Sequence, residues 1–560
     1  MKTILIGVGL LAALGAAASA EEKADRIFVN GRIWTGDDAR PSVEALAVRE
    51  TRILALGTSE EMRKRAETGT EIVDLKGRFM APGFDDAHLH FMSGSLDLDA
   101  LSLDDARTVE ELQWRIGAWA KANPDRPWVA GRGWVYSAFA GGLPHKTLLD
   151  TVVADRPAWM TSYDGHAGWA NSAALRKAEV HRGTADPPGG AIVRDERGEP
   201  TGVLKDTAMA LVAAHVPPPV PEEKYRALRK GIDRAASFGL TSVQNAGFDE
   251  EDFRVYEEVL GEGRLKLRVS FALSFEKNLG PDALARYREL KGKHASEHIR
   301  IATVKGFVDG VVEARTAAMF EPYAGGGGSG LPRWTQEDLD RTAALYDREG
   351  FQIQLHAIGD RAVSMALDAF EHAARANGPL VRRHRIEHLE VPRLADLARF
   401  KALGVVASTQ AFFARPDENH NQVYLPALGP ERAARAMPFK AIDDAGVVQA
   451  FGSDWPVYPC EVLKGIYCAV TRMTPQGTPA GGWEPAQRIS VEAALRHFTR
   501  DAAYASQEEA IKGTLTPGKL ADLVVLSENI LAVPPERILR TKVLLTVRGG
   551  QDTYRAQEFR

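Results

Sequence analysis

Histidines and an aspartate recur at the ends of apolar segments in this chain. His88 and His90 stand two residues apart in DAHLH, His356 and His388 close QIQLH and RIEH, and Asp454 closes AFGSD. Alternate residues of a strand point to the same face, so His88 and His90 can hold one ion between them. Imidazole and carboxylate groups suit zinc or a similar divalent ion. The spacing therefore predicts a metal centre.

Lys305, in ATVKGFVDG, is the unusual member of this set. A lysine that faces a metal pocket would be repelled as an ammonium, because burying a charge of the same sign as the metal is costly. Carbamylation by carbon dioxide would turn the side chain into an anion whose two oxygens can bridge two ions. The alternative is an ordinary surface or salt-bridged lysine, and spacing alone does not choose between them.

Each histidine taken alone is weak evidence. A lone histidine is more often a satisfied core or surface residue than a ligand, and alternating histidines also occur on ordinary strand faces. A metal site is indicated by the joint placement of candidate ligands at four separate strand ends: His88/His90, His356, His388 and Asp454.

Eight apolar strands are predicted to position these residues. They cover residues 79–90, 240–247, 265–275, 299–310, 351–360, 385–390, 404–413 and 447–456. Helical stretches such as residues 335–350, which opens with Thr335, lie between them. Alternation of strand and helix implies a parallel sheet, and eight strands close a (β/α)8 TIM barrel whose active site lies at the carboxyl ends of the strands. The candidate ligands end strands one, five, six and eight.

The flanking segments predict further domains. Residues 21–80 and 501–560 read as short strands with turns, including a hairpin at Asn30-Gly31, and suggest one small β-sandwich domain built from both chain ends. The barrel then spans residues 81–500. About 150 residues separate its first two strands, too many for a normal loop, so an inserted subdomain at about residues 95–235 is expected.

Residues 1–20 carry the pattern of a secretory signal peptide. Lys2 precedes an apolar run, and Ala18-Ser19-Ala20 forms a small-residue cleavage site. The alternative, an uncleaved anchor helix, would need a longer run, since about 20 apolar residues span a bilayer. We therefore expect a periplasmic or secreted protein, with no membrane contact in its mature form.

Composition narrows the classes of function. The 560 residues are 44% hydrophobic and carry a formal charge of −5, which excludes a disordered chain and argues against a nucleic-acid partner. The two cysteines, Cys460 and Cys468, cannot staple a fold of this size and lack the spacing of a thiolate zinc site. A small-molecule substrate is the expected partner, and a homodimer is left open.

The segments PGFDDAHLH, VKGFVDG, QIQLHAIGD, HRIEHLE and FGSDWPV resemble the successive metal-site motifs of the amidohydrolase superfamily, and LTPGKLADLVVL resembles that family's return to its β-sandwich domain. Residues 155–175 and the segment PPGGAIVRDERGEPTGVLKDTA that follows resemble the branch typified by N-substituted formamide deformylase. Two positions depart from the pattern: Gly306 replaces a bulkier apolar residue, and Gln244-Asn245 stands where many relatives carry an acidic partner.

The resemblance implies a role for each candidate residue. It makes His88, His90 and Asp454 ligands of an inner zinc ion, with Lys305 as the bridging carbamate. His356 and His388 would hold an outer ion. His166, in YDGHAGWANS, matches a position next to the substrate, although a purely structural histidine is nearly as well supported.

Aromatic residues in the insertion and loops hint at an apolar substrate substituent. Trp134, Tyr163 and Trp455 are the candidates for substrate contact, and ordinary core packing is the alternative for each. The leading hypothesis is a metal-dependent hydrolase of a non-peptide C–N bond, an N-acyl or N-formyl amide, with Asp454 moving the protons and His166 assisting. One rival acts on an ester, lactone or small peptide-like bond at the same site, and another is a non-catalytic binding protein on a hydrolase scaffold.

Overall fold

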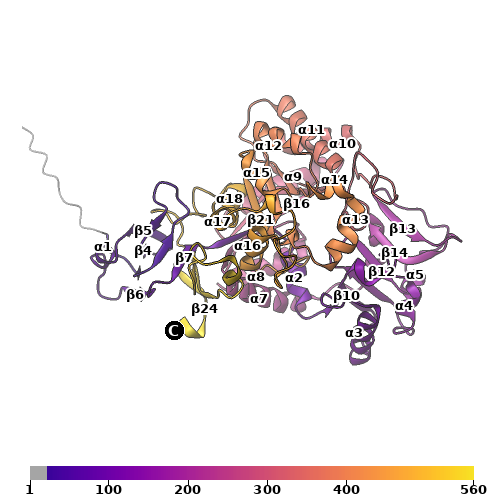
Figure 1. Ribbon diagram of the computed structural model, residues 1–560, viewed down its shortest axis with the longest axis horizontal. Coiled ribbons are helices and arrows are strands. Elements are labelled where there is room, and N and C mark those ends of the chain that lie inside the picture. Colours follow the sequence, from indigo (N-terminus) through magenta and orange to yellow (C-terminus); the bar gives the residue numbers. More distant parts are fainter. Residues whose placement is uncertain (1–21, 560) are drawn as a thin grey trace, which may run out of the picture.

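The computed structural model describes residues 22–559, so the predicted signal peptide lies outside the described residues. Figure 1 shows a β-rich region around β4 (Ala45–Arg49) at one end, a barrel wrapped by helices in the middle and a second β-rich region around β12 (Ala167–Ala170) at the other end. Among residues 22–559, no helix has both the length and the apolar character that crossing a membrane requires.

Eight parallel strands form the central sheet. In spatial order they are β8 (Phe84–Leu89), β15 (Leu240–Asn245), β16 (Arg268–Ser274), β17 (Ile299–Phe307), β18 (Gln352–Ala357), β19 (Arg385–His388), β20 (Val406–Gln410) and β21 (Gln449–Gly452). All six residues of β18 are buried, as expected for a parallel strand covered on both faces. Between β21 and β8, the backbone N–H of Asp454 donates to the carbonyl oxygen of His88 (2.7 Å). The predicted TIM barrel is confirmed.

Helices lie between these strands along the chain and after the last of them. The main ones are α7 (Pro221–Ser237), α8 (Glu250–Gly261), α9 (Pro281–Lys293), α10 (Gln336–Arg348), α11 (Asp360–Asn377), α12 (Leu397–Leu403), α15 (Phe439–Asp444), α16 (Val462–Thr471), α17 (Val491–His497) and α18 (Arg500–Ala505). α10 begins where the sequence predicts, because the Thr335 side chain accepts a hydrogen bond from the N–H of Asp338 and so satisfies a free donor of the first turn.

The predicted first strand, residues 79–90, is two strands in the structure. β7 (Phe79–Pro82) belongs to a different sheet, and β8 enters the barrel after Gly83. A Cβ atom at Gly83 would lie 2.4 Å from the side chain of Thr241, so only glycine lets the chain pass this close to β15. An apolar run alone does not reveal such a change of sheet.

Two sheets stand at the chain ends. One contains β5 (Arg52–Gly57), β4, β1 (Arg26–Val29) and β6 (Glu71–Asp74). The other combines N-terminal β7, β2 (Arg32–Trp34) and β3 (Ser42–Val43) with C-terminal β22 (Leu523–Leu526), β23 (Val543–Arg548) and β24 (Gln551–Arg555). The domain boundaries at residues 80 and 500 stay predictions.

The predicted hairpin at Asn30-Gly31 is wrong. β1 and β2 flank this turn but lie in different sheets and do not pair with each other. Asn30 does take a left-handed conformation (φ 54°), so the turn chemistry is right. The chain uses the turn to cross from one sheet to the other, a choice made by packing rather than by the two turn residues.

A separate six-stranded sheet lies between β8 and β15 in the chain. Its order is β13 (Gly190–Arg194), β14 (Pro200–Asp206), β12, β11 (Ala158–Ser162), β10 (Val129–Trp134) and β9 (Leu101–Ser102). Residues at the ends of β11 and β14, namely Asp164, His166 and Asp206, line a cavity together with barrel residues. The inserted sheet thus supplies part of the wall of the site.

Candidate metal centre and active site

Three ligand-type side chains meet where β8, β19 and β21 end. One ligand atom from each of His88, His388 and Asp454 lies within 4.8 Å of the other two. Oδ1 of Asp454 is 3.5 Å from Nε2 of His88 and 3.5 Å from Nε2 of His90, so the second histidine of the pair reaches the same carboxylate. Strands that are more than 350 residues apart in the chain thus bring together four predicted ligands.

The backbone aims two of these side chains. His388 and Asp454 both have positive φ angles, 75° and 57°, which non-glycine residues seldom adopt. Such strain is typical of functional sites and persists only where the surroundings hold it. At Asp454 the hydrogen bond to the His88 carbonyl helps to do so.

The donor atoms fit a divalent cation. Nε2 of His88, Oδ1 of Asp454 and Nζ of Lys305 are buried and have no hydrogen-bond partner among residues 22–559. Leaving buried polar atoms unsatisfied costs about 1–3 kcal/mol each, more when they are charged. Burial also lowers the pKa of His88 and of His388 well below the ordinary value, so both imidazoles are neutral and have a lone pair to give.

Lys305 lies on β17 and faces the same region. Its side chain is 5% exposed, forms no ion pair within the described part of the chain and places Nζ 4.4 Å from the centroid of the Phe307 ring. Burial lowers its pKa to about 8. It is therefore neither a surface lysine nor a salt-bridged one. The glycine at position 306, next to Lys305, has a steric explanation: a Cβ there would lie 2.7 Å from the ring of Phe275.

His356 lies beside the cluster of three rather than within it. Its Nε2 donates to the carbonyl oxygen of Gly310 (3.0 Å), and its ring centroid is 4.4 Å from that of His388. In this arrangement Nδ1 is the nitrogen left to bind an ion. Nε2 is also 3.6 Å from Asp309, whose carboxylate accepts backbone hydrogen bonds from three loop residues.

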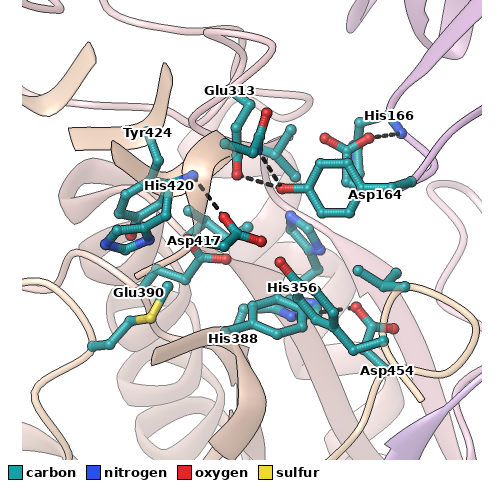
Figure 2. Close-up of a pocket in the computed structure, with 18 residues that line it drawn as sticks. Asp164, His166, Glu313, His356, His388, Glu390, Asp417, His420, Tyr424 and Asp454 are labelled. Carbon is teal, nitrogen blue, oxygen red and sulfur yellow. Dashed lines mark hydrogen bonds and ion pairs between the residues drawn. The ribbon is translucent and has the colours of Figure 1, made fainter. Parts of the chain in front are cut away.

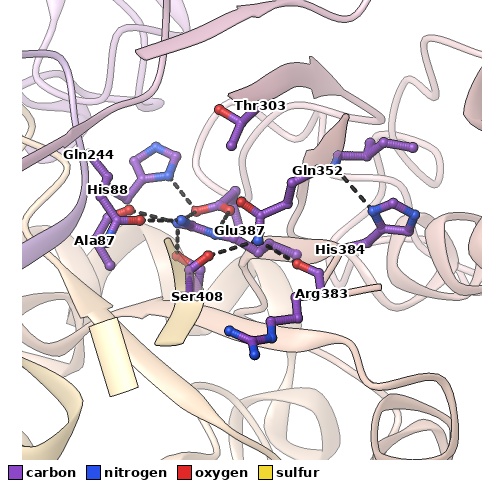
Figure 3. A network of polar contacts seen from close by, with 12 residues as sticks. Ala87, His88, Gln244, Thr303, Gln352, Arg383, His384, Glu387 and Ser408 are labelled. Atoms are coloured by element: carbon purple, nitrogen blue, oxygen red, sulfur yellow. Dashed lines mark hydrogen bonds and ion pairs between the residues drawn. The ribbon is translucent and has the colours of Figure 1, made fainter. Parts of the chain in front are cut away.

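Glu387 holds His88 from within the barrel (Figure 3), and Arg385 in turn holds Glu387. Nδ1 of His88 donates to Oε2 of Glu387 (2.5 Å), and Arg385 donates to both carboxylate oxygens of Glu387 at 2.8 and 3.0 Å. Arg385 also donates to the Ser408 hydroxyl (2.9 Å). Arg385 and Glu387 are completely buried. A proton fixed on Nδ1 leaves the Nε2 lone pair of His88 for an ion, the usual role of a carboxylate behind a ligand histidine.

Gln244 belongs to the same network. Its Oε1 accepts from Arg385 (2.5 Å) and its Nε2 donates to Asp85 (3.2 Å), which forms an ion pair with Lys512 (2.9 Å). An amide can both accept from a guanidinium and donate to a carboxylate, whereas a second carboxylate could only accept. The departure from the family pattern at this position therefore has a local explanation.

His166 faces the cavity from the inserted sheet. Its Nδ1 donates to Asp206 (2.7 Å), and Asp206 also pairs with Arg333 (2.8 Å). Burial by itself would lower the pKa of His166, but the bond to Asp206 outweighs it and raises the pKa. The His166 ring centroid is 5.2 Å from that of His356. His166 thus lies next to the candidate ligands.

A cavity opens over the centre (Figure 2). His356, His388 and Asp454 line one part of it, together with His166. The other part is lined by Tyr163, Asp164, Glu313, Glu390, Asp417, Asn419, His420, Tyr424 and Tyr458. A molecule in this cavity touches both the candidate metal ligands and a group of carboxylates.

The three aromatic residues predicted to contact substrate have different places. Tyr163 lines the cavity, and its hydroxyl donates to Glu313 (2.6 Å). Trp134 is completely buried in the inserted sheet, where its Nε1 donates to the carbonyl of Met160 (2.9 Å), so it packs the core and does not reach the cavity. Trp455 packs on Phe91 (5.4 Å between centroids) and lines a neighbouring groove instead.

Several residues of the site were missed by sequence reasoning. Asp164 and Asp206 lie within segments already singled out, YDGHAGW and GVLKDTA, and a carboxylate close to a candidate histidine was the available signal. Glu390 closes the predicted strand of residues 385–390, two residues after His388, and that placement was the available signal. Glu313 and Asp417 follow no strand-end pattern. They belong to loops that only the folded chain brings to the cavity.

Comparisons with known proteins agree with this geometry. A family model described as "Amidohydrolase family" matches residues 71–554. The protein LONG AFTER FAR-RED 3 of Arabidopsis thaliana is 33% identical over 541 residues, which cover 95% of this chain and 92% of that protein. The N-substituted formamide deformylase of Arthrobacter pascens is 26% identical over 549 residues, covering 95% of this chain and 98% of that enzyme.

A solved structure gives the same result. That of an uncharacterized metal-dependent hydrolase from Pyrococcus horikoshii OT3 superposes with a TM-score of 0.72 at 26% identity, covering 91% of this chain and 99% of that one. The barrel, the strand-end ligands and a family match over most of the chain lead to one conclusion: this protein belongs to the amidohydrolase family.

Proposed function

We propose that this protein is an exported, metal-dependent hydrolase of non-peptide C–N bonds, most directly of N-acyl or N-formyl amides. The observation that carries the proposal is the buried group of His88, His388 and Asp454. Nε2 of His88 and Oδ1 of Asp454 have no hydrogen-bond partner among residues 22–559, and His388 and Asp454 line the cavity. His90, His356 and Lys305, the last as its carbamate, would complete the ligand set. A zinc ion bound there supplies Lewis acidity and lowers the pKa of water to about 7.

Asp454 is placed to move the protons of the reaction. Burial raises the pKa of its carboxyl group to about 7 where no ion is bound, and a carboxylate beside the attacking water can take up a proton and release it again. It would accept the proton of the attacking water at a carboxylate oxygen and deliver it to the leaving nitrogen. Its fixed backbone, bonded to His88, keeps that oxygen over the cavity.

His166 is placed to bind the substrate carbonyl. Its Nδ1 is committed to Asp206, and the raised pKa favours the imidazolium, whose Nε2–H can donate to an oxygen in the cavity. A hydrogen bond that strengthens as charge develops on that oxygen lowers the barrier. Asp206 and Arg333 fix the direction of the ring.

A side-by-side substrate panel tests the proposal. The metal-loaded protein is given N-formyl and N-acetyl amides, esters and lactones of matched size. We expect amide turnover that a chelator abolishes and added zinc restores. If the protein turned over esters or lactones but not amides, the rival hypothesis of an esterase or lactonase would hold instead. A fully metal-loaded protein that turns over none of them would favour the binding-protein alternative.

Export is part of the same proposal. Its support is the signal-peptide pattern of residues 1–20. Mass measurement of the protein recovered outside the cytoplasm should give a chain that begins at Glu21. A chain that keeps Met1 in the membrane fraction would contradict it.

A further inference from the structure

One part of the cavity is rich in carboxylates that are not candidate ligands. Asp164, Glu313, Glu390 and Asp417 all line it, and Figure 2 shows Glu313, Glu390 and Asp417 around one part of the cavity. They come from the inserted sheet and from three separate loops of the barrel. Four carboxylates around one cavity repel one another when they are ionised, and a positive charge between them would relieve that repulsion.

Within residues 22–559, only one of these four carboxylates has a cationic partner. Asp417 pairs with Arg415. No lysine, arginine or histidine nitrogen of residues 22–559 comes within 4.0 Å of the carboxylates of Asp164, Glu313 or Glu390. Asp164 and Glu313 instead accept from hydroxyl and backbone donors. The protein itself therefore provides no counter-charge for Asp164, Glu313 or Glu390 when they are ionised.

The pKa of Glu313 shows that its charged form is unfavourable at this place. Burial, and then the neighbouring Asp164 carboxylate, raise the pKa of Glu313 to about 7. A cation bound in the cavity would favour the ionised form of this group.

Aromatic rings complete the walls. Tyr163, Tyr424 and Tyr458 line the same cavity, and the hydroxyl of Tyr163 donates to Glu313 (2.6 Å) and accepts from Asn419 (3.2 Å). Aromatic faces attract ammonium and guanidinium groups through their quadrupoles, an attraction that carboxylates reinforce.

His420 supplies an independent sign that a ligand is missing. It is 6% exposed, lines the cavity, and its Nε2 has no hydrogen-bond partner among the described residues. Its ring stacks on Tyr424 (4.8 Å between centroids), which holds it in place. Burial lowers its pKa to about 3, so the imidazole is neutral and its free nitrogen can accept from an N–H donor.

A second metal centre does not explain these residues. The three-residue group of ligand atoms within 4.8 Å of one another is His88, His388 and Asp454, and within residues 22–559 no such group includes Glu313 or Glu390. Their spacing is too wide for one small ion and suits a larger organic cation with several N–H donors.

We propose that this part of the cavity binds an organic cation, an alkylammonium or guanidinium group carried by the substrate. This proposal rests on the proposed function in one respect, namely that the cation belongs to an amide substrate. The reactive bond would lie at His388 and Asp454, while the cation lies among Glu313, Glu390 and the tyrosines. The carboxylates thereby select the substrate class.

Calorimetry on the metal-loaded protein tests the proposal without turnover. The probes are hexylammonium and 1-hexanol, which differ in charge but hardly in size. We expect hexylammonium to bind at least about tenfold more tightly, in line with charge-assisted hydrogen bonds. Glu313→Gln keeps the acceptor for Tyr163 but removes the charge, and should abolish most of this preference. Glu321→Gln, an exposed residue on the same segment, should leave it unchanged.

Two results would overturn the proposal: equal affinity for the two probes, or a preference that survives Glu313→Gln in protein with normal metal content. Glu390→Gln is the second variant if Glu313→Gln does not fold, with the same expected loss. An amine that merely coordinates the metal would keep its preference in both variants. If no amide is turned over but hexylammonium is still preferred, only the proposed function is contradicted. If amides are turned over but hexylammonium is not preferred, only the cation site is contradicted.

Discussion

Asp454 joins the two edges of the barrel. Its backbone N–H donates to the carbonyl oxygen of His88 (2.7 Å), and its Oδ1 lies 3.5 Å from Nε2 of the same histidine. Asp454, two residues after the last strand, thus both joins that strand to the first one and presents a ligand beside it. Barrel closure and site assembly are the same event here, so a change at either residue should affect both.

Metal binding should depend on the three-residue cluster. We expect the wild-type protein to hold one or two divalent ions, and His388→Ala to lose at least one of them, because a ligand of the buried group is gone. Elemental analysis of the purified, folded protein measures this. His372→Ala, an exposed histidine on α11, is the matched control and should keep the wild-type metal content. Active, unchelated protein without any transition metal would refute the metal centre.

Asp454→Asn should slow catalysis while the fold survives. The change is nearly isosteric but removes the group that takes up and releases the proton, so kcat should fall by about 10²- to 10⁴-fold. Steady-state kinetics on an amide found by the panel, with metal content confirmed, measures the loss. Asp444→Asn, at the exposed end of α15, should behave as wild type. A near-normal kcat in Asp454→Asn would move the proton transfer to another residue, His166 first.

Lys305 should carry a carbamate. Its buried Nζ has no partner among the described residues, and a carbamate would supply oxygens to the ions. Lys305→Ala should lose metal and most activity, and short carboxylic acids should restore part of both by filling the gap. Carbon NMR after exchange with ¹³C-labelled bicarbonate should show a carbamate signal that this variant lacks. The exposed Lys401→Ala serves as control. Full metal content and activity in Lys305→Ala would make Lys305 an ordinary lysine.

Glu387→Gln should weaken metal binding without touching a ligand. The carboxylate holds the proton on Nδ1 of His88 and is itself held by Arg385. Loss of such support lowers metal affinity by about 10- to 100-fold. Competition with a chelator of known affinity measures the change. Equal affinity in the variant and the wild type would mean that Glu387 serves only the stability of the barrel.

His497 should make stability depend on pH. Burial alone would lower its pKa, but hydrogen bonds to Asp443 (3.4 Å) and Asp501 (2.9 Å) outweigh it and raise the pKa from 6.5 to about 9. Because the folded pKa is the higher one, the stabilisation is complete below about pH 6.5 and is lost as the pH rises to about 9. The shift corresponds to roughly 3 kcal/mol.

Denaturant unfolding of wild type and His497→Gln across this pH range measures the effect. The wild type should lose its advantage over the variant between about pH 6.5 and 9. Parallel pH profiles would show that the imidazolium does not contribute.

Local sequence determined the elements and the ligand types. Each of the eight barrel strands was visible because an apolar run is a local property, and each candidate ligand was visible because it ends such a run. His88 and Asp454 could be placed at one site because the carboxyl ends of parallel strands share one face of a barrel.

Tertiary structure alone decided which sheet a strand joins and which side chains share a cavity. β7 belongs to a terminal sheet, although the sequence predicts it as part of the first barrel strand. β1 and β2 lie in different sheets, although the turn between them is typical of a hairpin. Trp134 looks the same in sequence whether it packs a core or faces a substrate. Glu387 and Glu313 acquire their roles from partners that are 299 and 150 residues away in the chain. Burial and charge balance depend on such distant neighbours, so they exist only once the chain has folded.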